Sequence, residues 1–406
     1  MGTHQRHGGE RNLMSDVADR ARLDFPVFAS RTYLNSGSYG AMCLAVKAAI
    51  EEYIDTRMNI GSDWEHWVDK LEQARTLLAR LVGCNPDEMS VSTSVSESVN
   101  SLASALDFSG RRNGIVVTDF DFPTTSQIWL AQMRRGAHVT RAAADESGTH
   151  ISLERFERLI DDRTLLVSVP YVCFRNGVRL DPRPIIALCR ERGAMVLIDA
   201  YQAVGSFPIN VRELDVDFLA GGCLKYLIGT AGAGFMYVRG GGNAGLQPFM
   251  TGWFAQENIG SMDIYHHRPS PTARRFESGT PNVCGLYAVC AGLEYLLGVG
   301  LEAVDARIRV LTAAIAQRTV AHGWQLVSPT DPEGHGATMA IRSTDAAALV
   351  KRLNDARIIL SHRDGNLRVS THFYNNLSDL DHLFEELGRN EELIARPPGM
   401  GAMASA

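Results

Sequence analysis

Lys225 and Asp199 are the two residues whose types and surroundings point most directly to chemistry. Only four of the 40 basic residues are lysines, and Lys225 lies in a turn of small residues between Gly221 and Gly234. A lysine shielded from water has a lowered pKa and can form a Schiff base with a carbonyl compound. Asp199 ends the apolar stretch 195–199, which predicts an acid at the rim of a sheet. The pair suggests an amine that holds a carbonyl cofactor and an acid that keeps a ring nitrogen protonated.

Other residues could bind a phosphate, a flat ring and a carboxylate. Val95 and Ser96 open a predicted helix whose free N–H groups could hold an anion, although an ordinary helix start has the same pattern. Phe122 follows a strand and could stack on a flat ring or fill the core. Arg368 lies between apolar strand residues, so its guanidinium is either paired internally or available to a bidentate carboxylate.

The elements that would position these residues alternate between short apolar strands and amphipathic helices. Strands are predicted at 114–118, 164–169, 195–199 and 233–238. Helices are predicted at 41–57, 63–82, 95–106, 183–191 and from 285 to 296. This alternation favours an α/β fold with a mostly parallel sheet, in which ligands bind at the carboxyl ends of the strands.

The length of 406 residues allows two or three domains. We expect an N-terminal extension over 1–28, a large domain over 29–284 and a smaller α+β domain over 285–390. Residues 391–406, rich in Pro, Gly, Ala and Met toward the end, predict a disordered tail. Either Met1 or Met14 could be the natural start.

Composition narrows the class of ligand. The net charge of -6 is spread without basic runs, so neither nucleic acid nor an anionic membrane is an expected partner. The seven cysteines are odd in number and form no Cys-x-x-Cys pair, which favours a reducing cytoplasm and argues against disulfides and a zinc site. No apolar run reaches the roughly 20 residues of a membrane span. A small molecule is the expected ligand, and no metal is expected.

The stretch from Asp199 to Val238 resembles the class V aminotransferase-like enzymes of fold type I, which depend on pyridoxal 5′-phosphate (PLP). This family includes cysteine desulfurases, kynureninases and isopenicillin N epimerases. The aspartate, Gln202, Lys225 and the trailing glycines all fall at the family spacing, and the likeness covers roughly residues 30–390. It implies PLP as cofactor, a large domain with a seven-stranded sheet, and a homodimer with shared active sites.

The resemblance also implies a role for each matching residue. Lys225 would form the Schiff base with PLP, and Asp199 would pair with the pyridine nitrogen. The remaining cofactor contacts would be Gln202 at the phenolic oxygen, Val95 and Ser96 at the phosphate, Phe122 on the ring, and Thr280 at the phosphate across a dimer interface. The substrate contacts would be Arg368 at the α-carboxylate, Trp253 and Asn35.

Departures from the family patterns narrow the reaction. Desulfurases need a cysteine on a mobile loop of the small domain. The corresponding segment here, residues 358–368, is short and contains no cysteine. Thr125 replaces the acid that kynureninases carry after Phe122-Pro123-Thr124, whereas Phe174 is closer to kynureninases than to desulfurases. Leu224 replaces the tyrosine or histidine that usually precedes the lysine, so one phosphate contact is missing.

The leading hypothesis is a PLP-dependent lyase that acts on an α-amino acid through an external aldimine and a quinonoid and expels a β-substituent, such as the thiolate of a cysteine conjugate. A kynureninase-like hydrolase, an epimerase, a decarboxylating deaminase and an aminotransferase share these steps and stay open. A dinucleotide-binding oxidoreductase would need a Gly-x-Gly-x-x-Gly turn, whose spacing residues 35–40 lack. A degenerate binding protein would not need Lys225, Asp199 and Arg368 together.

Overall fold

A seven-stranded sheet forms the centre of the computed structural model, which describes residues 18–241 and 245–397. The strand order is β2-β8-β7-β6-β5-β3-β4, and only β8 runs antiparallel to its neighbours. The strands are β2 (Met89–Ser92), β3 (Gly114–Thr118), β4 (His138–Ala142), β5 (Thr164–Pro170), β6 (Met195–Asp199), β7 (Phe218–Gly222) and β8 (Gly234–Val238). The predicted α/β class with a mostly parallel sheet is confirmed.

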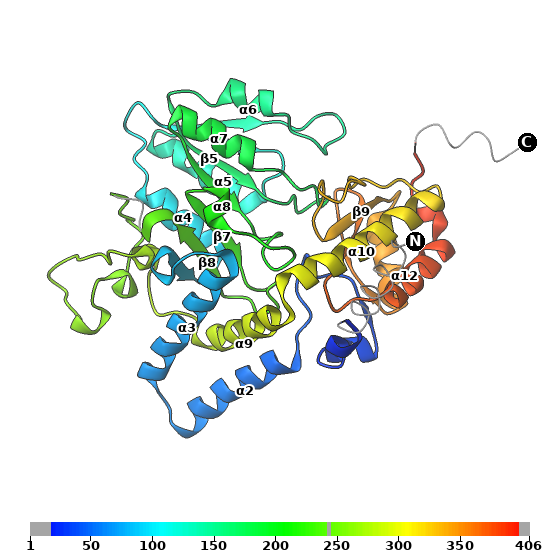
Figure 1. Ribbon diagram of the computed structural model, residues 1–406, viewed down its shortest axis with the longest axis horizontal. Coiled ribbons are helices and arrows are strands. Elements are labelled where there is room, and N and C mark those ends of the chain that lie inside the picture. Colours follow the sequence, from blue (N-terminus) through cyan, green and yellow to red (C-terminus); the bar gives the residue numbers. More distant parts are fainter. Residues whose placement is uncertain (1–17, 242–244, 398–406) are drawn as a thin grey trace, which may run out of the picture.

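Helices cover both faces of this sheet (Figure 1). In β3, Ile115 and Val117 pack on one face with Trp129 of α5, whereas Val116 packs on the other face with Ile186 of α7. Burial on both faces explains why the strands are continuous apolar runs. The helices are α2 (Leu44–Asn59), α3 (Trp64–Val82), α4 (Val95–Ala105), α5 (Pro123–Ala131), α6 (Leu153–Leu159), α7 (Arg183–Arg192), α8 (Val211–Leu214) and α9 (Val283–Val299).

A second, three-stranded antiparallel sheet with the order β11-β12-β9 is built from the C-terminal part of the chain. Its core contains Trp324, Met339, Leu367 and Leu383, all fully or almost fully buried. A short parallel pair, β1 with β10, ties the N-terminal segment to this part of the molecule. The elements are β1 (Thr32–Tyr33), α10 (Leu301–Ala321), β9 (Thr338–Arg342), α11 (Ala346–Asp355), β10 (Ile358–Ile359), β11 (Ser361–Arg363), β12 (Asn366–Ser370) and α12 (Leu377–Arg389).

The helices α9 and α10 meet at Gly300, whose φ of 89° ends one helix and starts the next at a new angle. The two axes differ by 77°. Within the described residues, no single helix is long and apolar enough to cross a membrane; α9 and α10 pass that test only as a bent pair, by length and composition.

The chain is ordered beyond residue 390, where the sequence predicts a disordered tail. Residues Glu391–Leu393 form a short 3-10 helix, and the Ala395 N–H donates to Arg342 O over 3.0 Å. The prediction is therefore wrong for residues 391–395, because backbone hydrogen bonds to β9 hold this stretch. Residues 398–406 and both candidate start methionines lie outside the described residues.

Candidate active site

Lys225 lies in the connection between β7 and β8, where close backbone packing fixes its position. The Gly40 N–H donates to Leu224 O over 2.8 Å, and a Cβ atom on Gly40 would lie 2.2 Å from Lys225 O. On another side, a Cβ atom on Gly205 would lie 2.6 Å from Tyr226 O. Glycine is required at both contacts, so the lysine backbone is tightly wedged between two other segments.

The amine of Lys225 is surrounded by protein although part of the side chain is still accessible. Its Nζ lies 4.1 Å from the centre of the Tyr201 ring. Loss of hydration lowers the pKa of Lys225 to about 8; the charge of Asp199 opposes this shift, whereas the cations Arg368 and Arg363 reinforce it. A larger fraction of this amine is neutral near physiological pH than in an ordinary lysine, which suits a nucleophile or a base.

Asp199 ends β6 and is buried beside the amine. Its Oδ1 accepts a hydrogen bond from the Tyr201 N–H over 3.0 Å, and its Oδ2 accepts one from Thr125 Oγ1 over 3.3 Å. Burial raises the pKa of Asp199, while the two hydrogen bonds and the charge of Lys225 act in the opposite direction. A buried carboxylate of this kind is stabilised by a further cationic partner.

One cavity brings four of the predicted site residues together: Lys225, Asp199, Gln202 and Phe122. Its other lining residues are Phe120, Pro170, Val172, Phe174 and Tyr201. Gln202 Nε2 donates to Gly37 O over 3.0 Å, and its buried Oε1 has no hydrogen-bond partner among the described residues. The cavity thus has aromatic and aliphatic walls with a few polar atoms, an arrangement that fits a flat heteroaromatic ring.

The predicted phosphate residues lie where β2 leads into α4. Ser94 caps α4 by accepting a hydrogen bond from the Glu97 N–H over 3.1 Å, which leaves Val95 and Ser96 in the first turn. A Cβ atom on Gly234 would lie 2.6 Å from the carbonyl carbon of Ser94, so the turn packs closely on β8. The start of an 11-residue helix presents N–H groups and a positive dipole end, both suited to a phosphate.

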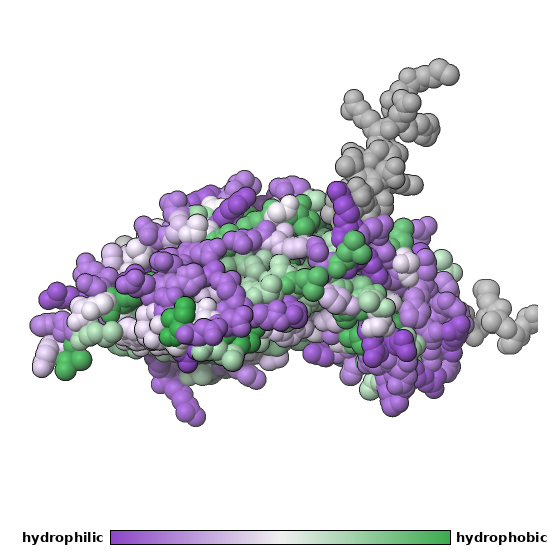
Figure 2. Space-filling model, turned by 90° about the horizontal axis from the view of Figure 1, so that it is seen from below, coloured by the Kyte–Doolittle hydropathy of each residue, from purple (hydrophilic) through white to green (hydrophobic). Residues whose placement is uncertain are grey.

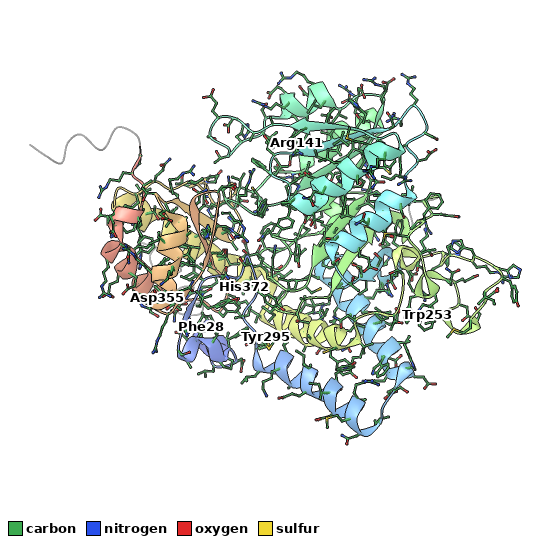
Figure 3. The ribbon with its side chains drawn as sticks, turned by 180° about the vertical axis from the view of Figure 1, so that it is seen from behind. Phe28, Arg141, Trp253, Tyr295, Asp355 and His372 are labelled. Atoms are coloured by element: carbon green, nitrogen blue, oxygen red, sulfur yellow. The ribbon has the colours of Figure 1, made fainter. Side chains whose placement is uncertain are left out.

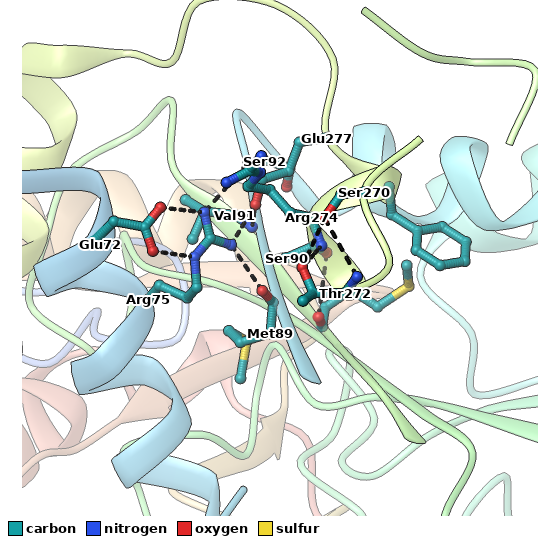
Figure 4. A network of polar contacts seen from close by, with 12 residues as sticks. Glu72, Arg75, Met89, Ser90, Val91, Ser92, Ser270, Thr272, Arg274 and Glu277 are labelled. Atoms are coloured by element: carbon teal, nitrogen blue, oxygen red, sulfur yellow. Dashed lines mark hydrogen bonds and ion pairs between the residues drawn. The ribbon is translucent and has the colours of Figure 1, made fainter. Parts of the chain in front are cut away.

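Thr280 is exposed and lines a different hollow, together with Thr93 and Glu97 at the same helix start. A buried network anchors the turn that carries it (Figure 4). Arg75 of α3 donates to Glu277 and to Met89 O, and Glu277 also accepts a hydrogen bond from the Val91 N–H over 2.9 Å. The network therefore joins α3, β2 and the Thr280 turn.

Arg368 of β12 is 2% exposed and has no carboxylate partner among the described residues. Its Nη2 is 3.4 Å from Gly37 O and its Nη1 is 3.4 Å from Ser361 Oγ, while Nε has no partner. Burial lowers the pKa of Arg368 to about 10, so the side chain is still a cation at neutral pH. Asn35 forms a parallel β-bridge with Ser370, which is in the same strand as Arg368. Its buried Oδ1 also has no hydrogen-bond partner among the described residues. A buried cation with free donors fits an incoming carboxylate.

Trp253, predicted to contact substrate, does not line the Lys225 cavity of its own chain. Figure 3 shows it at the base of a protruding arm, far from His372. It packs against Trp64, with ring centres 5.9 Å apart, and lines a hollow of about 710 Å³ with residues 256–259 and 261–268. Its contact with substrate stays a prediction that requires a second copy of the chain.

Sequence reasoning missed three residues that shape the site: Thr125, Tyr201 and His372. In the sequence, Thr125 stands out only as a departure from a family pattern, and its contact with Asp199 joins segments 74 positions apart. The glycine at position 222 is the one sequence feature that relates to the position of Tyr201, because a Cβ atom on Gly222 would lie 2.4 Å from the tyrosine ring. His372 is fully buried and bonds to Tyr226 O. These contacts are set by tertiary packing.

The mostly parallel sheet, the cavity that Lys225 and Asp199 share, and the helix start at Val95 suit a PLP-dependent enzyme of fold type I. The sequence matches the model of the family "Aminotransferase class-V" over residues 33–383, and the chain belongs to that family. Its cofactor is therefore PLP, and the enzyme is of the cysteine desulfurase and kynureninase type.

Relatives with different names cover most of the chain. An "Uncharacterized aminotransferase YcbU" of Bacillus subtilis is 32% identical, over 92% of this chain and 98% of the relative. A "Kynureninase" of Geobacillus thermodenitrificans is 25% identical, over 85% and 84%. The solved structure of a cysteine desulfurase from Thermococcus onnurineus has a TM-score of 0.82 at 21% identity, over 92% and 97%. A cystine C-S lyase bound to its product cysteine persulfide has a TM-score of 0.80 at 21% identity, over 89% and 98%.

Proposed function

We propose that this enzyme is a PLP-dependent lyase that expels a sulfur substituent from the β-carbon of an α-amino acid. Bound PLP supplies an electron sink for the pair of electrons that the α-proton leaves behind. As the Cβ–S bond breaks, a thiolate leaves, and hydrolysis of the released aminoacrylate gives pyruvate and ammonia. The proposal uses Lys225, Asp199 and two phenylalanines that line one cavity, together with Arg368, whose charge acts on Lys225.

Each residue has one task in this proposal. Arg368 binds the α-carboxylate and so orients the substrate, since it is the buried cation with free donors. Lys225 Nζ takes the α-proton, for which its lowered pKa is suited. Asp199 holds the proton on the pyridine nitrogen. Phe122 and Phe174, whose ring centres are 5.0 Å apart, form an aromatic wall of the cavity.

The observation that carries this choice is the hairpin of β11 and β12 beside the site. Ser361 and Arg368 are directly paired across it, and the connection consists of Asp364 and Gly365 alone. The segment is therefore too short to hold a mobile loop, and it contains no cysteine to accept a sulfur atom. A sulfur-containing product would leave the enzyme instead of being transferred to it.

A kynureninase-like hydrolase is the second candidate. Phe122-Pro123-Thr124 and Phe174 support it, as do several kynureninases among the relatives, at 25% to 28% identity. Thr125 argues against a kynureninase-like hydrolase, because it has a hydroxyl at the position where kynureninases carry a carboxylate. An epimerase, a decarboxylating deaminase and an aminotransferase have no specific support among the contacts of the site.

An assay of the holoenzyme against S-substituted cysteines and kynurenine distinguishes these candidates. The lyase predicts pyruvate and a thiol from at least one cysteine conjugate, and the hydrolase predicts anthranilate and alanine from kynurenine. Both activities should be lost in Lys225→Ala. If the wild-type holoenzyme yields none of these products, both candidates are wrong.

The proposal includes a homodimer with shared active sites. Leu44, Ile54 and Met58 of α2 are 46%, 46% and 77% exposed in the single chain. Figure 2 looks onto the molecule from this side and shows apolar surface among polar side chains. The arm that carries Trp253 also has exposed apolar side chains at Ile264 and Tyr265. A second copy covering these surfaces would remove them from water.

A further inference from the structure

The hairpin of β11 and β12 presents two arginines on the same face. Ser361 pairs with Arg368 across the hairpin, and opposed residues in an antiparallel pair point to one side. Arg363, two positions after Ser361, points to that side as well. The opposite face packs into the C-terminal core through fully buried Leu367, the partner of His362. The arginine face is thus directed away from this core.

The position of Arg363 is well defined although its side chain is exposed. Asp364 and Gly365 form the turn with φ of 50° and 70°, the positive values that two-residue hairpin turns use. Ser361 Oγ lies 3.2 Å from Ser38 Oγ, in the segment that packs on the Lys225 backbone. A rigid strand end next to the lysine loop therefore carries the Arg363 guanidinium.

Arg363 has no acidic partner within residues 18–241 and 245–397. The neighbouring carboxylate, Asp364, is 3.5 Å from Arg175 instead. Among the described residues, the Arg363 guanidinium donates a hydrogen bond only to His362 O, over 2.6 Å. Its charge acts on both Lys225 and Arg368, lowering the pKa of each. An unpaired cation therefore lies at the rim of the site, close enough to influence both groups.

We propose that Arg363 binds an anionic group at the far end of the substrate, so that the preferred substrates are α-amino acids whose β-substituent ends in a carboxylate or sulfonate. This inference rests on the proposed β-elimination for the direction in which the substituent extends. With the α-carboxylate on buried Arg368, the substituent can extend along the hairpin toward the mouth. Arg363 is the diagonal neighbour of Arg368 across the hairpin, and such positions are roughly 7–8 Å apart, a span that a short thioether can bridge.

Binding of two matched ligands to the holoenzyme tests the proposal. S-carboxymethyl-L-cysteine and S-carbamoylmethyl-L-cysteine have the same shape and differ in one negative charge. Wild type should bind the anion about fivefold more tightly, as expected of one partly exposed charge pair, and added salt should weaken this preference. The change in cofactor absorbance within the first milliseconds after mixing, before product accumulates, gives both dissociation constants.

Variants assign the preference to one side chain. Arg363→Gln should abolish it while leaving the affinity for the neutral ligand unchanged, and Arg363→Lys should retain part of it. His362→Gln on the opposite face of the strand and Arg389→Gln on α12 are controls that should keep the full preference. Equal binding of the two ligands by wild type, or an equal loss for both in Arg363→Gln, would overturn the proposal.

Product release separates this inference from the proposed function. A charge preference in binding without pyruvate or thiol release supports the subsite and contradicts the lyase. Product release with equal efficiency for both ligands supports the lyase and contradicts the subsite. The two hypotheses can therefore fail independently.

Discussion

The imidazole of His372 donates a hydrogen bond from Nε2 to the backbone carbonyl of Tyr226 over 2.9 Å, directly after Lys225 in the chain. Its Nδ1 accepts a hydrogen bond from the Phe373 N–H over 2.9 Å, which fixes the tautomer with the proton on Nε2. Burial lowers the pKa of His372 to about 4, so the ring is neutral at physiological pH. This neutral donor connects the end of the small sheet to the lysine loop.

The first prediction concerns acid stability. Unfolded His372 takes up a proton near its ordinary pKa of 6.5, whereas the folded residue does so only near 4. Stability from this group is therefore fully present above pH 6.5 and is lost as the pH falls toward 4, by at most about 3 kcal/mol. In His372→Gln, which does not titrate, this part of the pH dependence should disappear. Urea unfolding at several pH values checks it; the same slope in both proteins would contradict it.

The α/β fold and the Lys225–Asp199 pair could be predicted because they leave local signals. Strand β6 is an apolar run that ends on a carboxylate, and the lysine stands among glycines. Strand β7 gave a weaker signal, since its last residues are Ala, Gly and Gly, and Gly222 is small to accommodate the Tyr201 ring. The bond from His372 to Tyr226 joins residues 146 positions apart. No local pattern encodes such a contact, because packing of the small sheet on the lysine loop creates it.

The second prediction concerns the amine of Lys225. Its pKa of about 8, against an ordinary 10.5, means that apoprotein should capture PLP faster as the pH rises, with a midpoint near 8. The charge of Asp199 raises this pKa, so Asp199→Asn should move the midpoint lower. Stopped-flow absorbance of apoprotein mixed with PLP gives the profile, and Lys225→Ala supplies the blank. A midpoint near 10.5 in wild type would show that the amine is fully hydrated.

The third prediction assigns Thr125 a positioning role. Thr125→Val keeps the volume but removes the hydroxyl that donates to Asp199 Oδ2, which leaves a buried carboxylate with one fewer donor. We expect PLP affinity to fall about five- to tenfold, the loss of roughly 1 kcal/mol for one hydrogen bond. Thr125→Ser should restore most of the affinity. Fluorescence titration of apoprotein measures it, and equal affinities for Val and Ser variants would argue against the hydrogen bond.

The fourth prediction concerns assembly. Met58 is 77% exposed on α2, so Met58→Asp should leave the fold of each chain intact while placing a charge on the proposed contact surface. Light scattering after gel filtration should show a dimer for wild type and a shift toward monomer for the variant. Leu23→Asp, at a residue that is 81% exposed outside α2, is the matched control. An unchanged dimer in Met58→Asp would place the interface elsewhere.

The fifth prediction concerns the buried pair of Arg75 and Glu277, both 4% exposed at the side chain. Arg75→Met leaves Glu277 buried without its cation, which should destabilise the protein by about 3–5 kcal/mol. Adding Glu277→Leu removes the uncompensated charge and should recover part of that loss. Because Glu277 begins the turn that leads to Thr280, Arg75→Met should also weaken PLP binding if that turn contributes to the phosphate site.

Four proteins complete this test: wild type, the two single variants and the double variant. Urea unfolding of the apoprotein gives the coupling energy between Arg75 and Glu277, and PLP titration of the same four proteins gives the effect on the cofactor. A coupling energy near zero would mean that the two charges act independently. Strong coupling in stability with unchanged PLP affinity would show that the network supports α3 and β2 but has no part in positioning Thr280.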